Sequence, residues 1–455
     1  MKNTDQNIRV IISDDNVSIK RDENKCIKCG ECARICSKIE SINNNYDINL
    51  SKEPICMNCG QCVKICPTNC INAKEEYKQI EQEIASGKIV IVSTAPAVRV
   101  AIGDEFGYRR GTFLQGKMVA LLKALGFKYV LDANFGADVT VCEEAYEFIN
   151  RLKNGNNLPQ FTSCCPTWVK FVETYYPEFI NNLSSCKSPI SMQGTLIKTY
   201  FAQKLGIDAK QIVNVTLTPC VAKKYEIKRE ELKNTLLNDN TKVHDNDYCI
   251  TTMELVKWAK EKQIDLHNLD DQNFDSIMGE SSGGGIIFGA SGGVMESALR
   301  MAYYYETKEL PPKQLLAFKS VRGIKGIKEA EVTIGNKNLK VAVVSNLANA
   351  RILLNKIKSG NHYDFVEVMA CPCGCIGGGG QPKHLGDEIT TLKSRADALY
   401  TKDKNSNIKL ACQNEEIKEL YESFLISPNS ELAKSLLHTK FVDKSASLGN
   451  NPARK

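Results

Sequence analysis

The sequence contains little of what would place the protein in a membrane, on nucleic acid or outside the cell. No uninterrupted apolar run approaches the roughly 20 residues that a membrane helix needs. The first ten residues, MKNTDQNIRV, lack the sections of a signal peptide, so a cytoplasmic location is expected. The net charge is only +6 and the lysines are scattered among acidic residues, which gives nucleic-acid binding little support.

Histidine is also scarce. The chain has five histidines in 455 residues, and none of them falls within a run of possible metal ligands, so we assign no histidine to a metal. The remaining composition, 42% hydrophobic and 25% charged, excludes a disordered or fibrous chain and predicts a globular protein of two or three domains.

Cysteine, by contrast, is abundant. Nineteen cysteines are unlikely to be disulfides in a reducing compartment, so metal ligation is the leading explanation. Burial as small apolar side chains explains single thiols, and we give this structural role to Cys70, Cys142, Cys249 and Cys412. It does not explain clusters of cysteines at fixed spacing.

Two cysteine runs near the N-terminus repeat one pattern thirty residues apart. In bacterial ferredoxins this spacing lets three thiolates of one run bind one cluster while the fourth reaches the other cluster. A zinc site is the alternative, but two tetrads with these gaps make it improbable. We therefore assign one [4Fe-4S] cluster to Cys26, Cys29, Cys32 and Cys66, and a second to Cys56, Cys59, Cys62 and Cys36.

The chain around these runs divides into four parts. Residues 1–20 are a β-prone segment in which Asp14, Asp15 and Asn16 signal the turn of a hairpin. Residues 21–75 would form a small α+β domain like bacterial ferredoxin with its two clusters. Residues 76–87 are predicted to be a connecting helix that Gly87 stops. Residues 88–455 are predicted to form the large remaining domain.

That large domain has the pattern of an α/β fold with largely parallel sheets. Apolar, strand-like runs alternate with helical stretches such as GKMVALLKAL and AYEFINRLK. The predicted strands cover residues 88–96, 128–135, 213–220, 339–346 and 363–371.

Three further cysteine motifs each follow a strand-like run: QFTSCCPTW (160–168), VTLTPCVAKK (215–224) and VEVMACPCGC (366–375). Ligands collect at the carboxyl ends of strands in α/β sheets, so the three ends could converge on one metal centre. The residues alone leave the four ligands open. They would be Cys164 or Cys165, then Cys220, and two of Cys371, Cys373 and Cys375.

These motifs resemble those of the [FeFe]-hydrogenases. TSCCPTW, TPCVAKKYE and EVMACPCGCIGGGGQP are similar to the three signature motifs of that family, and the double ferredoxin run matches its multi-cluster members. Other stretches are similar as well, among them FGADVTVCEEAYE, GESSGGGIIFGASGGVMESALR and SELAKSLLHTKF. The resemblance covers nearly the whole chain from about residue 25. It implies a catalytic domain of two α/β lobes around a buried metal cluster.

The resemblance also implies the ligands of that cluster. Cys165, Cys220, Cys371 and Cys375 would hold a [4Fe-4S] cubane, and Cys375 would bridge to a diiron unit with CO, cyanide and azadithiolate, together the H-cluster. We expect Gly377–Gly380 to let the backbone approach this group closely and to adopt positive φ where needed. Further residues expected to border the cofactor are Pro96, Ala97, Thr218 and Met369.

The family's proton path and cyanide contact can be carried over in the same way. Lys223 would donate a hydrogen bond to a cyanide ligand, whereas Lys224 fits a solvated surface lysine better. Cys164 would carry protons, because a thiol pKa near 8.5 suits both giving and taking them. The path to the surface would continue through Glu144, Ser184, Glu147 and Arg151. Glu144, Glu147 and Arg151 have helical spacing and would share one face.

Several residues depart from the family pattern. Thr218 stands where a methionine is usual, Ala97 where a serine commonly reaches cyanide, and Ile190 replaces a polar residue. Cys186 replaces an alanine, and Cys373 replaces a glycine between two ligands. Cys373 could be a reversible extra ligand, but we favour a space-filling role. Such changes are expected to alter rate or catalytic bias without removing a ligand.

The sequence thus predicts a ferredoxin hydrogenase that catalyses reversible H2 oxidation and proton reduction. Electrons would be exchanged with ferredoxin or flavodoxin through the two N-terminal clusters, and maturation proteins would supply the diiron site. A hydrogen-sensing protein with low turnover is the alternative. A non-catalytic iron-sulfur assembly protein would be expected to lack Cys164, Lys223 or the acid chain, and all are present.

Overall fold

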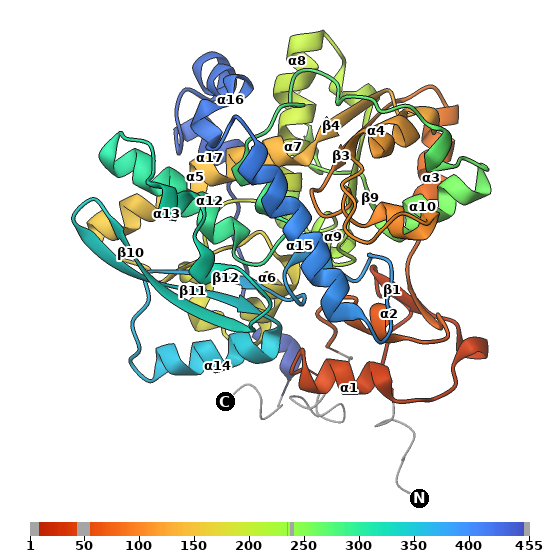
Figure 1. The fold of residues 1–455 in the computed structure, drawn as a ribbon, viewed down its shortest axis with the longest axis horizontal. Helices are drawn as coiled ribbons and strands as arrows, with labels where there is room; N and C mark the ends of the chain where they lie inside the picture. The colour runs from red at the N-terminus through yellow and green to blue at the C-terminus, as the bar shows by residue number, and fades with distance from the viewer. Residues whose placement is uncertain (1–8, 43–54, 234, 237–240, 450–455) are drawn as a thin grey trace, which may run out of the picture.

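The computed structural model describes residues 9–42, 55–233, 235–236 and 241–449, and contains two four-stranded sheets with helices packed around them (Figure 1). A smaller N-terminal part with α1 and α2 lies at one side of this body (Figure 1). In the described part of the chain no helix is both long enough and apolar enough to cross a membrane.

The first sheet is entirely parallel, as the alternating sequence pattern predicts. Its strand order is β4 (Tyr129–Asp132), β3 (Ile89–Thr94), β6 (Ile212–Thr218) and β9 (Tyr248–Thr251). The strands predicted at 88–96, 128–135 and 213–220 are therefore confirmed. β4 is shorter than predicted because the Asp132 side chain accepts a hydrogen bond from the Asn134 amide and so caps helix α5 (Ala133–Asn154).

The second sheet is mixed. Its order is β10 (Ile327–Ile334), β11 (Lys337–Ser345), β12 (Phe365–Met369) and β5 (Gln160–Phe161). β10 and β11 form an antiparallel hairpin, and the other two pairings are parallel. The strands predicted at 339–346 and 363–371 are confirmed as β11 and β12.

Helices cover both sheets and carry much of the core. The 22-residue helix α5 packs against α7 and α12, and its buried residues include Phe135 and Phe148. Both tryptophans, Trp168 on α6 and Trp258 on α10, are at most 1% exposed. The helices of eight or more residues in this body are α4 (Gln115–Ala124), α5, α6 (Pro166–Tyr175), α7 (Pro189–Leu196), α10 (Thr252–Glu261), α12 (Gly293–Thr307), α14 (Leu347–Lys358) and α15 (Glu388–Asn405).

The shorter helices of the body are α8 (Ala202–Leu205), α9 (Lys223–Glu226), α11 (Gly283–Ile287), α13 (Lys313–Leu316), α16 (Glu415–Leu420) and α17 (Glu431–Leu437). A two-residue pair, β7 (Thr235–Leu236) and β8 (Lys242–Val243), lies apart from the main sheets. His438 stands directly after α17 with an extended backbone.

The N-terminal part holds the one clear error in the predicted strands. Among residues 9–18 there is no strand, and β1 (Ile19–Arg21) pairs antiparallel with β2 (Ile71–Ala73) rather than closing a hairpin within residues 1–20. The turn itself is present, because the Asn16 side chain accepts hydrogen bonds from the amides of Ser18 and Ile19. Residues 1–8 lie outside the described part of the chain.

Three helices complete this N-terminal part. α1 (Glu31–Lys38) and α2 (Gln61–Ile65) each follow a glycine in the left-handed conformation, Gly30 and Gly60. α3 (Tyr77–Ala85) is the connecting helix predicted at 76–87, and Gly87 follows it with φ of 82°. A glycine accepts this φ without the steric cost that a side chain would bring.

Candidate metal centres

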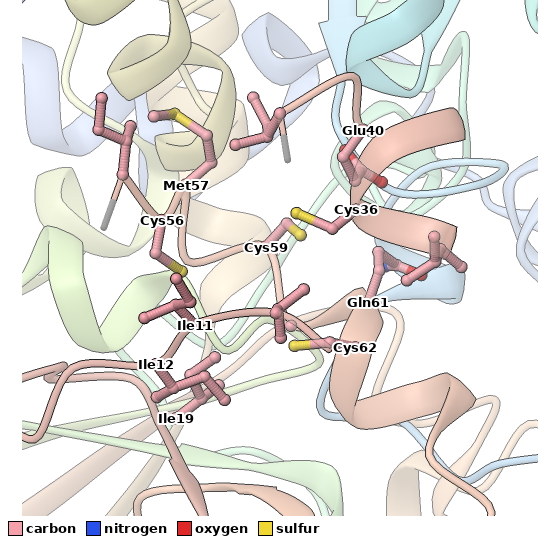
Figure 2. Close-up of a pocket in the computed structure, with 15 residues that line it drawn as sticks. Ile11, Ile12, Ile19, Cys36, Glu40, Cys56, Met57, Cys59, Gln61 and Cys62 are labelled. Atoms are coloured by element: carbon pink, nitrogen blue, oxygen red, sulfur yellow. The ribbon is translucent and has the colours of Figure 1, made fainter. Parts of the chain in front are cut away.

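Four cysteines from both N-terminal runs surround one cavity, here called the Cys36 cavity. Cys36 comes from α1, Cys56 and Cys59 from the loop before α2, and Cys62 from α2 itself. Figure 2 shows their sulfur atoms around the same hollow, with Glu40 beside it. The fourth cysteine of the first run thus joins the first three of the second run.

The reciprocal set lines a second hollow, here called the Cys26 cavity. Cys26, Cys29, Cys32 and Cys66 all border it, so the last cysteine of the second run joins the first three of the first run. Cys70 also borders this cavity and lies within hydrogen-bonding range of Cys26. The exchange of one cysteine between the runs is the arrangement that two ferredoxin-type clusters require.

Burial makes free thiolates costly in the Cys36 cavity. Desolvation raises the pKa of Cys59 and of Cys62 well above the ordinary value; the charge of Glu40 raises that of Cys59 further, and the charge of Cys56 that of Cys62. A set of buried thiols that resist ionisation needs a strongly cationic partner to become thiolate ligands, and iron ions supply that charge. The donor set therefore fits an iron-sulfur cluster.

The three remaining cysteine motifs lie at the carboxyl ends of strands from both sheets. Cys165 follows β5 and immediately precedes α6, and Cys220 comes two residues after β6. Cys371 comes two residues after β12. Since β6 belongs to one sheet and β5 and β12 to the other, the motifs meet between the two sheets.

Four thiols of these motifs face one another. After burial, the charges of Cys220 and Cys165 are the largest factors that raise the pKa of Cys375, and the same two thiols raise the pKa of Cys371. Burial, followed by the charge of Cys165, raises the pKa of Cys220 to about 12. Such mutual effects require close approach. Of the alternatives that the spacing left open, the structure groups Cys165, Cys220, Cys371 and Cys375.

Cys373 points elsewhere. It packs in an apolar cluster with Ile376 and Leu392, and its φ of 58° is unusual for a residue with a side chain. Burial raises its pKa to about 11, and none of the four grouped thiols is among the groups that shift it. This packing agrees with the space-filling role.

Within the described ranges no group of three His, Cys, Asp or Glu side chains that could hold a metal ion is found. The preference for iron-sulfur clusters over zinc therefore rests on the spacing of the cysteines and on their exchange between the two runs.

The glycine run after Cys375 has a different structural reason from the one predicted. None of Gly377–Gly380 has a positive φ; in this loop Gly374 has it, at 87°. Instead, a side chain on each would collide with neighbouring protein: Pro372 at Gly377, Pro219 at Gly378, Gly60 at Gly379 and Thr251 at Gly380. The expectation of positive φ is wrong, and the run is glycine because protein segments press against it.

The contact between Gly379 and Gly60 joins this loop to the Cys36 cavity. A Cβ on Gly379 would lie 2.7 Å from three backbone atoms of Gly60. Beside it, the Gln61 side chain donates a hydrogen bond to the Gly377 carbonyl at 3.1 Å. The second cysteine run therefore packs directly on the loop that carries Cys375.

Gly379→Ala is expected to destabilise the protein by about 1–3 kcal/mol, because the new methyl group meets backbone that cannot rotate away. The measurement is the unfolding midpoint of the cluster-loaded chain compared with wild type. Gly284→Ala is the control, since its nearest neighbours would be 3.2 Å or more from the new Cβ. Equal losses in the two variants would show that the Gly60 contact does not set the cost.

The side chain of Lys223 lies close to the grouped thiols. Its Nζ donates to the Cys164 carbonyl at 3.0 Å and pairs with Glu226 at 2.5 Å. Burial lowers the pKa of Lys223, but the charges of Glu226 and Cys220 outweigh burial and the net pKa is raised. A charged donor is therefore held beside Cys164 and Cys220.

The prediction for Lys224 is wrong. Lys224 is 0% exposed, and its Nζ donates to the Cys249 carbonyl and pairs with Glu254 at 3.1 Å. Glu254 also caps the start of α10 through the Thr251 amide. Lys224 thus ties the segment after Cys220 to α10 instead of facing solvent.

The predicted proton-path residues come from α5 and from the segment before α7, which carries Ser184. Ser184 donates to Glu147 Oε2 at 2.7 Å, and Arg151 donates to Glu147 Oε1 at 2.8 Å. Ser184 also lies close enough to Glu144 to lower the pKa of that carboxyl. Glu144, Glu147 and Arg151 share one face of α5 as their spacing predicts, but Glu144 is only 1% exposed.

Cys164 lies at the inner end of this chain. Burial raises the pKa of its thiol, and the next largest effect comes from the charge of Glu144. The charges of Cys165 and Cys375 follow, so Cys164 lies near both the acid and the grouped thiols. Burial followed by the charge of Glu147 raises the pKa of Glu144 to about 8.

The residues expected to border the cofactor occupy buried positions around the loops. Ala97 is 0% exposed and its carbonyl accepts from Gln381 at 2.8 Å, while Pro96 precedes it. The Thr218 hydroxyl donates to the Cys220 carbonyl at 3.1 Å and lies 3.7 Å from Cys249 Sγ. Met369 ends β12, two residues before Cys371, and is 3% exposed. The contacts of the Thr218 hydroxyl give this residue a structural role that involves protein atoms alone.

The sequence reasoning missed a second set of partners for Glu147. Ser185 donates to Glu147 Oε1 at 3.0 Å and lies 2.8 Å from His438 Nδ1, whose other ring nitrogen lies 3.1 Å from Glu143. Cys186 Sγ is 4.0 Å from Glu147 Oε2. In the sequence, the only indication of this contact was that the segment containing His438 is similar to the family. That similarity assigned no role to His438.

The family models match most of the chain. The iron only hydrogenase large subunit, C-terminal domain, matches residues 88–379, and the iron hydrogenase small subunit matches residues 387–444. The NADP-reducing hydrogenase subunit HndD of Solidesulfovibrio fructosivorans is 42% identical over 452 residues, which cover 95% of this chain and 76% of that protein.

Structural similarity agrees with these matches. An apo variant of [FeFe]-hydrogenase HydA1 from Chlamydomonas reinhardtii aligns with a TM-score of 0.72 at 37% identity, covering 81% of this chain and 99% of that one. At lower identity, 30% over 390 residues, the chain also resembles the cytosolic Fe-S cluster assembly factor narfl of Xenopus tropicalis, covering 81% of this chain and 78% of that protein.

Proposed function

Because the chain belongs to the iron-only hydrogenase family, we propose that it interconverts H2 with protons and electrons at an H-cluster held by Cys165, Cys220, Cys371 and Cys375. The observation that carries this proposal is the meeting of these four thiols beside Lys223 and Cys164. The cluster, when bound, would supply the redox chemistry on H2. An assembly factor has no evident use for the acid chain that leads inward to Cys164.

The protein's own residues would orient the cofactor and move protons. Lys223 has the charge and position to donate a hydrogen bond to a cyanide ligand. Glu147, Ser184 and Glu144 would pass protons between the surface and Cys164, beginning with the 2.7 Å contact between Ser184 and Glu147. Arg151 would hold Glu147 in position through its 2.8 Å contact.

Electrons would reach the centre through residues 21–75. Cys29 is exposed, so the Cys26 cavity is the natural entry, and the Cys36 cavity abuts the loop of Cys375 through Gly60 and Gln61. The proposed order is therefore the Cys26 cluster, the Cys36 cluster and then the cubane. Two [4Fe-4S] clusters would occupy these cavities, and residues 88–455 would form the catalytic domain.

The test is an assay of the full chain after maturation with the diiron cofactor. Infrared bands of CO and cyanide, together with H2 evolution from reduced viologen, are expected. Bands with negligible turnover would instead favour a hydrogen-sensing role. Failure to accept the cofactor in a folded, cluster-loaded protein would overturn the proposal.

The proposed electron partner is a ferredoxin or flavodoxin that docks over the Cys26 cavity. Ile27 is 64% exposed beside Cys29, and the side chain of Lys25 is 59% exposed. A small apolar contact beside an exposed lysine suits an acidic redox protein. Lys25→Glu combined with Ile27→Asp is expected to raise the KM for ferredoxin about tenfold, a loss of about 1.4 kcal/mol.

The control for this prediction separates docking from general damage. Viologen-driven H2 evolution by the double variant should stay near the wild-type rate, because a small dye needs no docking surface. Lys418→Glu on α16, a helix at the far end of the molecule from α1, should leave the ferredoxin KM unchanged (Figure 1). An unchanged ferredoxin KM in the double variant would place the entry site elsewhere.

A further inference from the structure

Two lysines of the large domain contact the two N-terminal cysteine runs in the same way. Lys170 Nζ donates to the Cys56 carbonyl at 2.7 Å and to Asn58 Oδ1 at 2.7 Å. Lys383 Nζ donates to the Cys66 carbonyl at 3.1 Å and to Asn69 Oδ1 at 2.6 Å. Each ammonium thus holds the carbonyl of a cluster-lining cysteine and the amide oxygen of the asparagine that follows it.

These two lysines differ from most buried lysines of the chain in their partners. Within the described ranges, neither Lys170 nor Lys383 has a carboxylate within 4.0 Å. Lys328 also lacks one and bonds to Ser291 and Gly323. The buried lysines that do pair with a carboxylate are Lys64 with Glu388, Lys187 with Asp245, Lys198 with Asp247, Lys223 with Glu226 and Lys224 with Glu254.

The surroundings of Lys170 carry excess positive charge. Its Nζ lies 4.3 Å from the centre of the Tyr225 ring, and Lys444 lies 5.6 Å from the same centre. The nearby carboxylate, Glu173, is already engaged by Arg229 at 2.6 Å and by Lys444 at 3.0 Å. A partly buried cation with no free carboxylate is costly, and another anion close by would offset that cost. The Cys36 cavity is where that anion would be.

A [4Fe-4S] cluster with four thiolate ligands is such an anion, and reduction adds one more negative charge. A fixed cation beside it stabilises the reduced form more than the oxidised form, which raises the reduction potential. Lys170 lies on α6, the helix that begins directly after Cys165. Lys383 lies three residues after the glycine run that follows Cys375. Each cation is therefore carried by a segment that also carries a candidate ligand of the central cluster.

We propose that Lys170 and Lys383 are positioning residues that raise the reduction potentials of the N-terminal clusters, Lys170 for the Cys36 cluster and Lys383 for the Cys26 cluster. This inference rests on the proposed function, because it requires both cavities to hold clusters. Through these contacts, the catalytic domain sets how readily its own electron relay is reduced.

The experiment is a redox titration of the full chain, loaded with its N-terminal clusters and followed by electron paramagnetic resonance. Lys170→Met is expected to shift the Cys36 cluster to a more negative potential and to leave the Cys26 cluster unchanged. Lys383→Met should do the reverse. Lys170→Arg and Lys383→Arg should restore the wild-type values, and Lys78→Met, an exposed lysine of α3 paired with Glu261, should shift neither.

A second pair of variants covers the case in which a methionine variant fails to assemble its cluster. Asn58→Asp and Asn69→Asp keep each lysine but give it a carboxylate partner, and each should lower the same potential as the corresponding methionine variant. Two intact clusters whose potentials do not move in any variant would overturn this inference alone. Absence of two reducible clusters in the wild-type chain would instead overturn the proposed electron route.

Discussion

Cys164→Ala is expected to lower H2 evolution by about 10²–10⁴-fold, the usual contribution of a positioned proton donor. Cys164 is the thiol that lies between Glu144 and the grouped cysteines, and it is not one of the four that face one another. Alanine removes the proton carrier without removing a ligand. The infrared bands of the matured site and the N-terminal cluster signals should therefore persist in the variant.

The measurement compares turnover at saturating reductant in wild type, Cys164→Ala and Cys164→Ser. Serine keeps the size of the side chain but ionises far less readily than a thiol, so its rate should also fall. Cys412→Ala removes a thiol that packs against the core and that receives charge effects from Lys418 and Asp138 instead of from Glu144 or the grouped thiols, and it should retain turnover. Full activity in both Cys164 variants would remove the thiol from the proton route.

The parts of this protein that the sequence predicted best are those in which neighbours in sequence act together. Cysteines separated by two residues bind the same metal centre if they bind a metal at all. The spacing alone therefore assigned the two N-terminal ligand sets. Apolar runs such as those of β3, β6 and β12 identified strands because the strands are buried on both faces.

The predictions that failed are those in which residues distant in the sequence determine the local structure. Lys224 is buried because Glu254, thirty residues later, lies opposite it, and a lysine beside another lysine gives no hint of this. Gly377–Gly380 are glycines because Pro372, Pro219, Gly60 and Thr251 press on them, which no local pattern reveals. β1 pairs with β2, which begins only after 49 intervening residues (22–70), and not with its sequence neighbours.

Helix α5 shows both a local feature that the sequence predicted and a property that depends on tertiary packing. The spacing of Glu144, Glu147 and Arg151 correctly placed them on one helix face. A charged helix face, considered alone, would be expected to lie in solvent. The burial of Glu144 depends on the elements packed over that face of α5, and burial is what raises its pKa to about 8. Sequence therefore predicted the positions of these groups, and tertiary packing determines their chemistry.

Glu144→Gln is expected to lower turnover by about 10²–10⁴-fold and to change its dependence on pH. In the wild type, Glu144 is protonated below about pH 8 and can donate to Cys164, so H2 evolution should decline as the pH rises through that value. Glutamine preserves the shape of the side chain but cannot release a proton. The residual activity of the variant should therefore lack the decline that Glu144 causes near pH 8.

A stability measurement checks the same group without the cofactor. The pKa of Glu144 is higher in the folded chain than its ordinary 4.5, so its favourable contribution to folding is complete below about pH 4.5 and is lost as the pH rises to about 8. Glu144→Gln has no such loss. The free energy of unfolding of the variant, relative to wild type, should therefore increase between pH 5 and pH 8. A difference that does not change with pH would mean that Glu144 is already ionised in the folded protein and cannot serve as the proton donor.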